Sequence, residues 1–302
     1  MGRRDANPVP PETLRWAAQA LGSGSRITSV RRLPRGGWHV NHAVNVLDRG
    51  GRVRRLVLRR WARPGWELAD PDFTAQREAQ VLTLLTDSTV PAPRLVAADP
   101  EPTVCDVPAL LLTRLPGHPP DRPKEVEGFL TQLANVLQTI HAVDGRATSV
   151  VPAYGRYADP ERLELPAWLP ASDAWERALE VARRPPPAGP SCFIHRDYHP
   201  GNTLWLRGRL TGIVDWTQAS WGSPSVDLGH MRWNLAVEHG PEVADRFLEI
   251  YRDLGGEVSG SLWYWDLVTV MDLFADAEAG SPLPKGDLMR LERHVVSSLP
   301  YV

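Results

Sequence analysis

The chain has 302 residues and a formal net charge of −2, which argues against nucleic acid or an anionic membrane as a dedicated partner. Two cysteines, Cys105 and Cys192, are too few for a disulfide framework. The sequence shows neither an apolar signal region nor an apolar run long enough to span a membrane, so we expect a cytoplasmic protein. The length favours two lobes over a single domain.

The first part of the chain is predicted to form a sheet preceded by a helix. Residues 11–21 carry apolar side chains at helical spacing and predict an amphipathic helix. Residues 27–33, 40–47 and 53–60 alternate or run apolar with many β-branched side chains, which is typical of strands. The turn residues at 48–51 indicate an antiparallel hairpin between the second and third strands.

The loop between the first two strands contains Gly36 and Gly37. Glycine lets backbone amides approach an anion because it has no Cβ atom. The same pair is equally compatible with an ordinary hairpin, so both interpretations stay open.

Further elements complete the N-terminal lobe. Residues 73–86 predict a helix, and 90–95 and 109–115 predict two more strands, so we expect a five-stranded antiparallel sheet with a helix against it. A Pro-Gly pair then interrupts the apolar run. We place the lobe boundary there, with an N-terminal lobe at 1–115 and a C-terminal lobe at 116–302.

The C-terminal lobe is predicted to be mostly helical and larger than the first. Residues 124–143 follow the helical period most clearly and are expected to form its central helix. The proline-rich stretch 183–190 is interpreted as a surface linker. Further helices are expected at 224–237, 241–254, 262–277 and 287–296.

Residues 195–202 read His-Arg-Asp-Tyr-His-Pro-Gly-Asn, which matches the H-R-D-x-x-x-x-N spacing of a kinase catalytic loop. A carboxylate at Asp197 suits the task of orienting an attacking hydroxyl and accepting its proton. Asn202, and Asp215 at the end of a short apolar strand, offer the oxygen atoms that Mg²⁺ prefers. The pattern therefore predicts a phosphoryl-transfer site.

An alternative interpretation takes His195, Asp197 and His199 as a transition-metal site of a hydrolase. It leaves Asn202 and Asp215 without a role. We therefore prefer a structural role for His195, in which the imidazole lies under the loop, bonds the backbone and holds Asp197 in place.

This segment resembles the aminoglycoside phosphotransferase family of small-molecule kinases, which carry His-x-Asp-x-x-x-x-Asn followed by a strand ending in aspartate. The resemblance spans about residues 25–275. It implies an α+β, bilobal, protein-kinase-like fold, ATP or GTP as co-substrate and Mg²⁺ as cofactor. A protein kinase is disfavoured because Asp215-Trp216-Thr217 lacks the glycine of D-F-G and no A-P-E segment follows.

The resemblance also implies an ion pair that holds the nucleotide phosphates. Kinases usually place a lysine on a strand of the first lobe, but this chain has no lysine before Lys124. The resemblance puts Arg59 in this position and Glu78 on the following helix as its partner. Arg60 is a competing candidate, although strand alternation sends it to the opposite face, and a solvated strand end is the alternative for Arg59.

Three further roles follow from the resemblance. The loop with Gly36 and Gly37 is expected to cover the triphosphate. Residues 112–115 correspond to the hinge that pairs with the nucleotide base, which assigns Thr113 and Leu115 to nucleotide binding. Asp227 is expected to brace the catalytic loop by accepting backbone hydrogen bonds, and a plain helix N-cap is its alternative.

The acceptor-binding residues are the least defined. The resemblance places Trp221, Trp233 and Trp263 near the acceptor cleft, where aromatic walls suit sugars, nucleosides or macrolides. Asp272 and Asp276 share a helical face and suit the amines of a polycationic acceptor. The alternatives are that the tryptophans belong to the core and that the carboxylates are solvated.

Three classes of function therefore compete. The first is an O-phosphotransferase that modifies a hydroxyl of an antibiotic of aminoglycoside, macrolide or nucleoside type and so confers resistance. The second is a metabolic kinase of the same fold that acts on an amino alcohol or a sugar. The third is a catalytically silent nucleotide-binding module. Either a monomer or a homodimer is compatible with the sequence.

Overall fold

The computed structural model describes residues 8–34, 39–62, 73–144, 146, 148, 150–170, 172–274 and 283–300. The chain divides into two compact units. The first contains Met1–Pro116 and Gly212–Gln218, and the second contains Gly117–Thr211 and Ala219–Val302. Each unit is described below in its own right.

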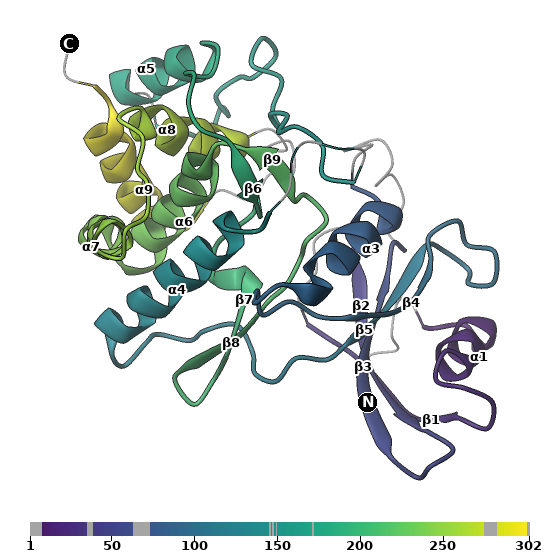
Figure 1. Cartoon of the computed structure of the whole chain (residues 1–302). Coiled ribbons are helices and arrows are strands. Elements are labelled where there is room, and N and C mark those ends of the chain that lie inside the picture. Colours follow the sequence, from purple (N-terminus) through teal and green to yellow (C-terminus); the bar gives the residue numbers. More distant parts are fainter. Residues whose placement is uncertain are drawn as a thin grey trace. The chain divides into compact units, whose positions relative to one another are not determined.

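The first unit is built on a five-stranded antiparallel sheet, as predicted, with the strand order β1-β2-β3-β5-β4 (Figure 1). Its strands are β1 (Arg26–Arg32), β2 (Val40–Leu47), β3 (Val53–Arg60), β4 (Leu95–Asp99) and β5 (Ala109–Thr113).

The fourth strand begins later than predicted. The sequence indicated residues 90–95, but β4 starts only at Leu95. Pro91 and Pro93 explain the error because proline cannot donate a hydrogen bond to a sheet. The carbonyl oxygen of Pro91 instead accepts the backbone N–H of Ile213 at 2.8 Å.

One face of this sheet is covered by α1 (Pro11–Gln19). Ala17 of this helix joins Val44, Leu56 and Leu58 in a buried core. Because alternate residues of a strand point to opposite faces, Arg59 of β3 lies on the other face. That face meets α3 (Ala75–Leu84), which is seen across the sheet from α1 in Figure 1.

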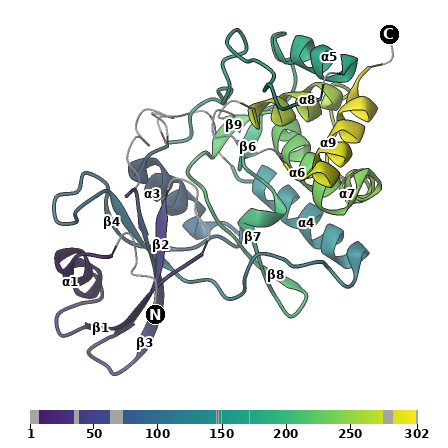
Figure 2. The ribbon, with the colours of Figure 1, turned by 180° about the vertical axis from the view of Figure 1, so that it is seen from behind.

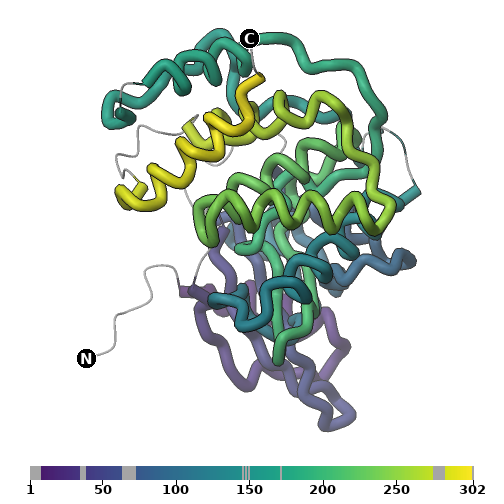
Figure 3. The backbone as a smooth tube through the Cα atoms, turned by 90° about the vertical axis from the view of Figure 1, so that its left-hand side faces the viewer, coloured from purple at the N-terminus to yellow at the C-terminus, as the bar shows by residue number. Residues whose placement is uncertain are grey.

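The second unit is mostly helical, and Figure 3 shows its green to yellow helices gathered together. Its described helices are α4 (Val126–His141), α5 (Asp173–Ala182), α6 (Pro224–His239), α7 (Pro241–Asp253), α8 (Leu262–Asp272) and α9 (Lys285–Ser298). Five of them correspond to the predicted helices, whereas α5 was not predicted.

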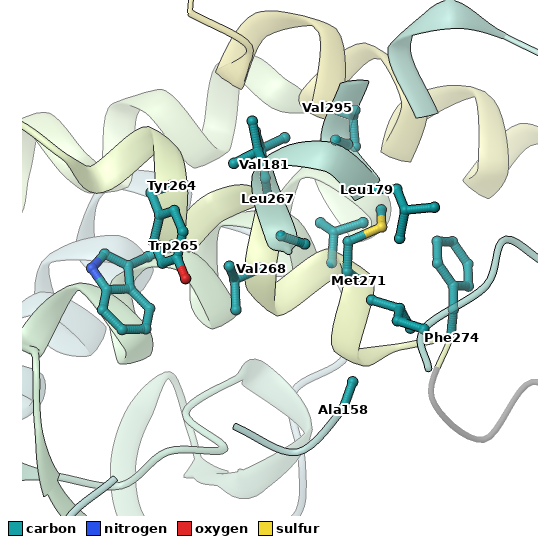
Figure 4. Close-up of a cluster of buried hydrophobic side chains, with 14 of the residues drawn as sticks. Ala158, Leu179, Val181, Tyr264, Trp265, Leu267, Val268, Met271, Phe274 and Val295 are labelled. Atoms are coloured by element: carbon teal, nitrogen blue, oxygen red, sulfur yellow. The ribbon is translucent and has the colours of Figure 1, made fainter. Parts of the chain in front are cut away.

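A large apolar cluster of this unit joins α5, α8 and α9. Its members include Leu179, Val181, Leu267, Val268, Met271 and Val295, all drawn in Figure 4. Nine of the eleven residues of α8 are buried, compared with six of the sixteen of α4. The helix predicted at 124–143 is present as α4, and its role as the central helix stays a prediction, since α8 is buried over more of its surface.

Short strands hold the segment that contains the predicted catalytic loop. The segment follows β6 (Cys192–Ile194), which pairs with β9 (Ser220–Gly222). It leads into β7 (Thr203–Leu206), which forms a hairpin with β8 (Arg209–Ile213) that lies beside α4 in Figure 2. The two-residue turn of this hairpin has φ values of 51° and 77°, both in the left-handed region that such turns require.

In the described part of the chain, no helix combines the length and the apolar character needed to cross a lipid bilayer.

Candidate active site

Asp197 and Asn202 lie close together in the second unit. The side-chain amide nitrogen of Asn202 donates to Asp197 Oδ2 at 2.7 Å and to the Asp197 carbonyl oxygen at 3.0 Å. Both contacts use the nitrogen, so the amide oxygen of Asn202 is left for another ligand. An amide oxygen suits Mg²⁺, so the donor chemistry fits the predicted cofactor.

The short turn between these residues depends on a close approach. The side chain of His199 accepts the backbone N–H of Gly201 at 3.2 Å. A Cβ atom at position 201 would lie 2.6 Å from His199 Cε1, so a larger residue there would displace the imidazole. Gly201 therefore allows the close contact between its backbone and His199.

Two residues near the predicted catalytic positions in the sequence have a left-handed backbone, Arg196 in the second unit and Asp215 in the first, each with a φ of 71°. This conformation is unfavourable for residues with a Cβ atom and persists where surrounding contacts hold it.

Asp227 supplies those contacts to the catalytic loop. Its buried carboxylate accepts the backbone N–H of His195 at 2.9 Å and that of Arg196 at 2.7 Å. The helix α6 is capped by Ser223, whose hydroxyl accepts the backbone N–H of Ser225 at 3.3 Å. The N-cap alternative for Asp227 is therefore wrong.

Two histidines lie under the loop. His195 is fully buried, and its Nδ1 accepts the backbone N–H of Asp197 at 3.3 Å. His141 Nε2 lies 3.1 Å from Asp227 Oδ2, and its Nδ1 lies 2.9 Å from the hydroxyl of Tyr251. Both ring nitrogens of His141 therefore face side chains.

The transition-metal alternative is not supported by the geometry. Within the residues that the structure describes, no group of three or more His, Cys, Asp or Glu side chains could hold a metal ion. The Nδ1 atom of His195 is already occupied by the backbone of Asp197.

In the first unit, Arg59 is surrounded by carboxylates. Its Nε atom lies 2.7 Å from Glu78 Oε2, and its Nη2 atom contacts Asp215 Oδ1. The same Nη2 donates to the Thr217 hydroxyl at 3.2 Å. Glu78 Oε1 accepts the backbone N–H of Trp216 at 3.4 Å, so the helix carboxylate also holds the backbone beside Asp215.

The electrostatics of this group follow from burial and pairing. Burial disfavours the charged form of Arg59, but the carboxylates of Asp215 and Glu78 outweigh it and raise the pKa of Arg59. Burial raises the pKa of Glu78, and the guanidinium of Arg59 opposes that shift. A buried arginine with two carboxylate partners is a charged group held in a fixed orientation.

Arg60 has a different environment from Arg59. Its guanidinium forms an ion pair with Asp106, whose carboxylate also accepts the hydroxyl of Thr13 at 2.9 Å. Thr13 belongs to α1, on the face of the sheet opposite to Arg59. Arg60 thus ties α1 to the sheet, and Arg59 is buried with its partners rather than solvated.

Two aromatic neighbours of Arg59 were missed. His39 Nε2 lies 3.1 Å from Arg59 Nη2, and the Trp61 ring centroid lies 5.6 Å from Arg59 Cζ. Trp61 could have been found, because residues two apart on a strand share a face. His39 had no comparable signal, because it lies just before β2 and outside the predicted strands.

The other predicted nucleotide-binding residues are only partly described. Thr113 bonds Arg94 through both its hydroxyl, at 2.8 Å, and its backbone N–H, at 2.9 Å. The side chain of Leu115 packs closely against Gly212. Gly36 and Gly37 lie outside the described residues, so the role of their loop remains a prediction.

The predicted acceptor residues have different surroundings. Trp221 lies on β9, opposite Phe193 of β6. The Trp233 ring lies 5.4 Å from His230, and no described residue bonds its buried indole nitrogen. Trp263 packs against the cluster of α5, α8 and α9, which favours its core alternative.

The two predicted acidic residues are Asp272 and Asp276. Asp276 lies outside the described residues. Asp272 accepts the backbone N–H of Ala158 at 3.3 Å, and burial raises its pKa to about 6, although Arg156 and Arg196 act against this shift. The alternative of a freely solvated Asp272 is therefore wrong, since the carboxylate is half-buried and accepts a backbone hydrogen bond.

The raised pKa of Asp272 predicts a pH-dependent stability. The folded protein binds this proton more tightly than the unfolded chain, for which the pKa is 3.8. The free energy of unfolding should therefore fall as the pH rises through this interval. In denaturant titrations, the free energy of unfolding of the wild type should fall by about 2–3 kcal/mol between pH 4 and pH 7 because of this group. Asp272→Asn keeps an acceptor oxygen but does not titrate, so its free energy of unfolding should lack this fall. Parallel curves of unfolding free energy against pH for wild type and Asp272→Asn would contradict this prediction. Asp253→Asn is the control, because Asp253 is exposed, and its curve should parallel that of wild type.

His230 is a neighbour of the catalytic loop that the sequence reasoning missed. Its Nε2 lies 3.2 Å from Asp197 Oδ1, and the Nε2 of His199 lies 3.7 Å from the same oxygen. His230 follows Asp227 by three residues on α6, so both face the catalytic loop. This helical spacing could have indicated His230.

The fold is shared by several solved phosphotransferases. A thermostable mutant of aminoglycoside phosphotransferase APH(4)-Ia, in complex with ADP and hygromycin B, is 15% identical, with 95% of this chain and 97% of that chain covered and a TM-score of 0.65. For a putative aminoglycoside phosphotransferase from Ralstonia eutropha the identity is 17%, both coverages are 95% and the TM-score is 0.64. Macrolide 2′-phosphotransferase MphH from Brachybacterium faecium is 18% identical, with coverages of 96% and 98% and a TM-score of 0.56. The predicted α+β, protein-kinase-like fold is thereby confirmed.

Residues 31–263 match the model of the phosphotransferase enzyme family, also designated APH. The chain belongs to this family, which confirms the predicted resemblance. Among curated proteins, mouse (Mus musculus) acyl-CoA dehydrogenase family member 10 is 23% identical over 195 residues. The match covers 59% of this chain and 18% of the mouse protein, so the chain spans less than a fifth of that relative's length.

Proposed function

We propose that the chain transfers the γ-phosphoryl group of ATP or GTP to a hydroxyl group of a small molecule. The observation that carries this proposal is the contact between Asn202 and Asp197, which holds one oxygen of the carboxylate while leaving an amide oxygen for a metal ion. Family membership and the fold support the same reaction type.

In the proposed reaction, Asp197 orients the acceptor hydroxyl and takes its proton. The hydroxyl oxygen bonds to the γ-phosphorus as the bond to the β-phosphate oxygen breaks, and the nucleoside diphosphate leaves. Arg59, held by Glu78, stabilises charge on the phosphates that are not transferred. Little covalent chemistry is asked of the protein, so positioning and electrostatics supply the rate enhancement.

Asn202 and Asp215 are proposed to hold Mg²⁺ through their side-chain oxygens. When bound, the ion neutralises charge on the nucleotide phosphates. Asp227 and His195 act through the loop backbone, and their contacts hold Asp197 in place.

The proposed acceptors are antibiotics of aminoglycoside, macrolide or nucleoside type. This class rests on the names of the similar solved structures, one of which is a complex with hygromycin B, and on Trp233, whose indole nitrogen has no partner among the described residues. A buried indole N–H is expected to find an acceptor, and a polar group of a bound ligand would supply one. The metabolic kinase and the silent module are the competing outcomes.

A nucleotide-consumption assay with two compound panels tests the proposal. The purified chain is incubated with ATP or GTP and Mg²⁺, first with antibiotics and then with amino alcohols and sugars. Consumption stimulated by an antibiotic supports the proposed class, and stimulation only by metabolites replaces it with the metabolic kinase. If neither panel stimulates consumption and no hydrolysis by water is detected, the silent module is the better account.

A further inference from the structure

The two carboxylate oxygens of Asp197 face different neighbours. Oδ2 accepts the amide of Asn202 at 2.7 Å, whereas Oδ1 lies 3.2 Å from His230 Nε2 and 3.7 Å from His199 Nε2. A donor on one oxygen alone still allows the carboxylate to rotate about its Cβ–Cγ bond. A second donor on the other oxygen fixes the plane of the group.

The imidazole of His230 is held in place by its surroundings. Its ring lies 5.7 Å from that of His199 and 5.4 Å from that of Trp233, with the rings tilted in both pairs. The preceding residue, Gly229, packs so closely on α8 that a Cβ atom there would lie 2.8 Å from the carbonyl oxygen of Trp265. The backbone of α6 is therefore closely packed beside His230, and this packing fixes the distance to Asp197.

The charge state of His230 suits a donor. Burial lowers its pKa to about 4, while the facing carboxylates of Asp197 and Asp227 act against this shift and the imidazoles of His199 and His195 act with it. At neutral pH the ring is uncharged and carries one N–H. A neutral donor can orient a carboxylate without the strong loss of basicity that a cation at 3 Å causes.

We infer that His230 is a positioning residue for Asp197, which fixes the plane of the carboxylate with its Nε2–H while Asn202 holds the other oxygen. The inference rests on the proposed function, because it assigns His230 a role through the proposed base. The contact at 3.2 Å is expected to shorten once the nucleotide and the acceptor are bound, as contacts to catalytic groups often do.

Two substitutions separate positioning from simple packing. His230→Leu fills a similar space without a donor, and His230→Gln places an amide N–H near the position of Nε2. His118→Leu is the matched control, since His118 is exposed and its Nδ1 lies 2.9 Å from the carbonyl oxygen of the neighbouring Pro119. The reaction is the slow transfer of the γ-phosphate of ATP to water in the presence of Mg²⁺, which needs no identified acceptor.

We expect His230→Leu to lower kcat by roughly 10- to 100-fold with the KM for ATP unchanged within about threefold, because only orientation of the base is lost. His230→Gln should restore kcat to within about fivefold of wild type. Each rate is divided by the folded fraction, measured by thermal unfolding. A purely structural role would lower the folded fraction and leave the corrected kcat unchanged in both variants, which would overturn the inference.

Asp197→Asn, measured in parallel, separates this inference from the proposed function. If Asp197→Asn keeps the wild-type rate, the proposed base is wrong. If Asp197→Asn loses activity while His230→Leu keeps it, only the role of His230 is wrong.

Discussion

Asp197→Asn is expected to lower kcat by at least about 10³-fold while the affinity for ATP stays within about threefold of wild type. An amide cannot accept the proton of the hydroxyl, but it keeps the shape of the carboxylate and the contact with Asn202. Steady-state kinetics measure the loss, and calorimetry measures the affinity in the presence of Mg²⁺.

Asp253→Asn is the control for this variant, because Asp253 is an exposed carboxylate at the end of α7. It should leave both quantities unchanged. If Asp197→Asn and Asp253→Asn keep the same rate, the assignment of Asp197 as the base is wrong.

Arg59→Ala is expected to have the second large effect, on both stability and nucleotide affinity. It leaves the buried carboxylate of Glu78 without its partner at 2.7 Å, so the free energy of unfolding should fall by roughly 3–5 kcal/mol. ATP affinity should fall by about 100-fold or more, because the charge that we propose to face the phosphates is lost. Arg59→Lys keeps the charge but not the planar guanidinium, which can contact two partners at once. Its free energy of unfolding and its affinity for ATP should lie between those of wild type and Arg59→Ala.

A double variant distinguishes these two effects. Arg59→Met combined with Glu78→Leu removes both buried charges, so stability should recover most of the loss seen in Arg59→Ala. ATP affinity should not recover, because no cation is restored. A double variant that binds ATP as tightly as wild type would show that Arg59 has only a structural role.

The parts of the site that could be predicted depend on local sequence. The catalytic segment keeps Asp197 and Asn202 five residues apart in one loop, so their proximity follows from chain connectivity. Alternation along β3 separates Arg59 from Arg60, and the structure shows different partners for each. The pairing of Arg59 with Glu78 was expected from the family resemblance, and the structure brings the two side chains together.

Other features depend on tertiary packing and could not be predicted. The burial of Asp272 requires the chain near Ala158 to lie against α8, and no local pattern indicates this contact. The prediction for 90–95 failed because β-propensity was weighed above the two prolines. His230 could have been predicted, because residues three apart on a helix share a face and Asp227 was already expected to contact the catalytic loop.

The central claim is that the chain moves a phosphoryl group and that Asp197 is the base. The most direct test uses ATP labelled in its γ-phosphate, Mg²⁺ and the compound that stimulates nucleotide consumption most, followed by separation of the products. The account predicts label on a hydroxyl of that compound with wild type and none above background with Asp197→Asn. Two results would contradict this prediction: label found only in inorganic phosphate, or equal labelling of the compound by wild type and Asp197→Asn.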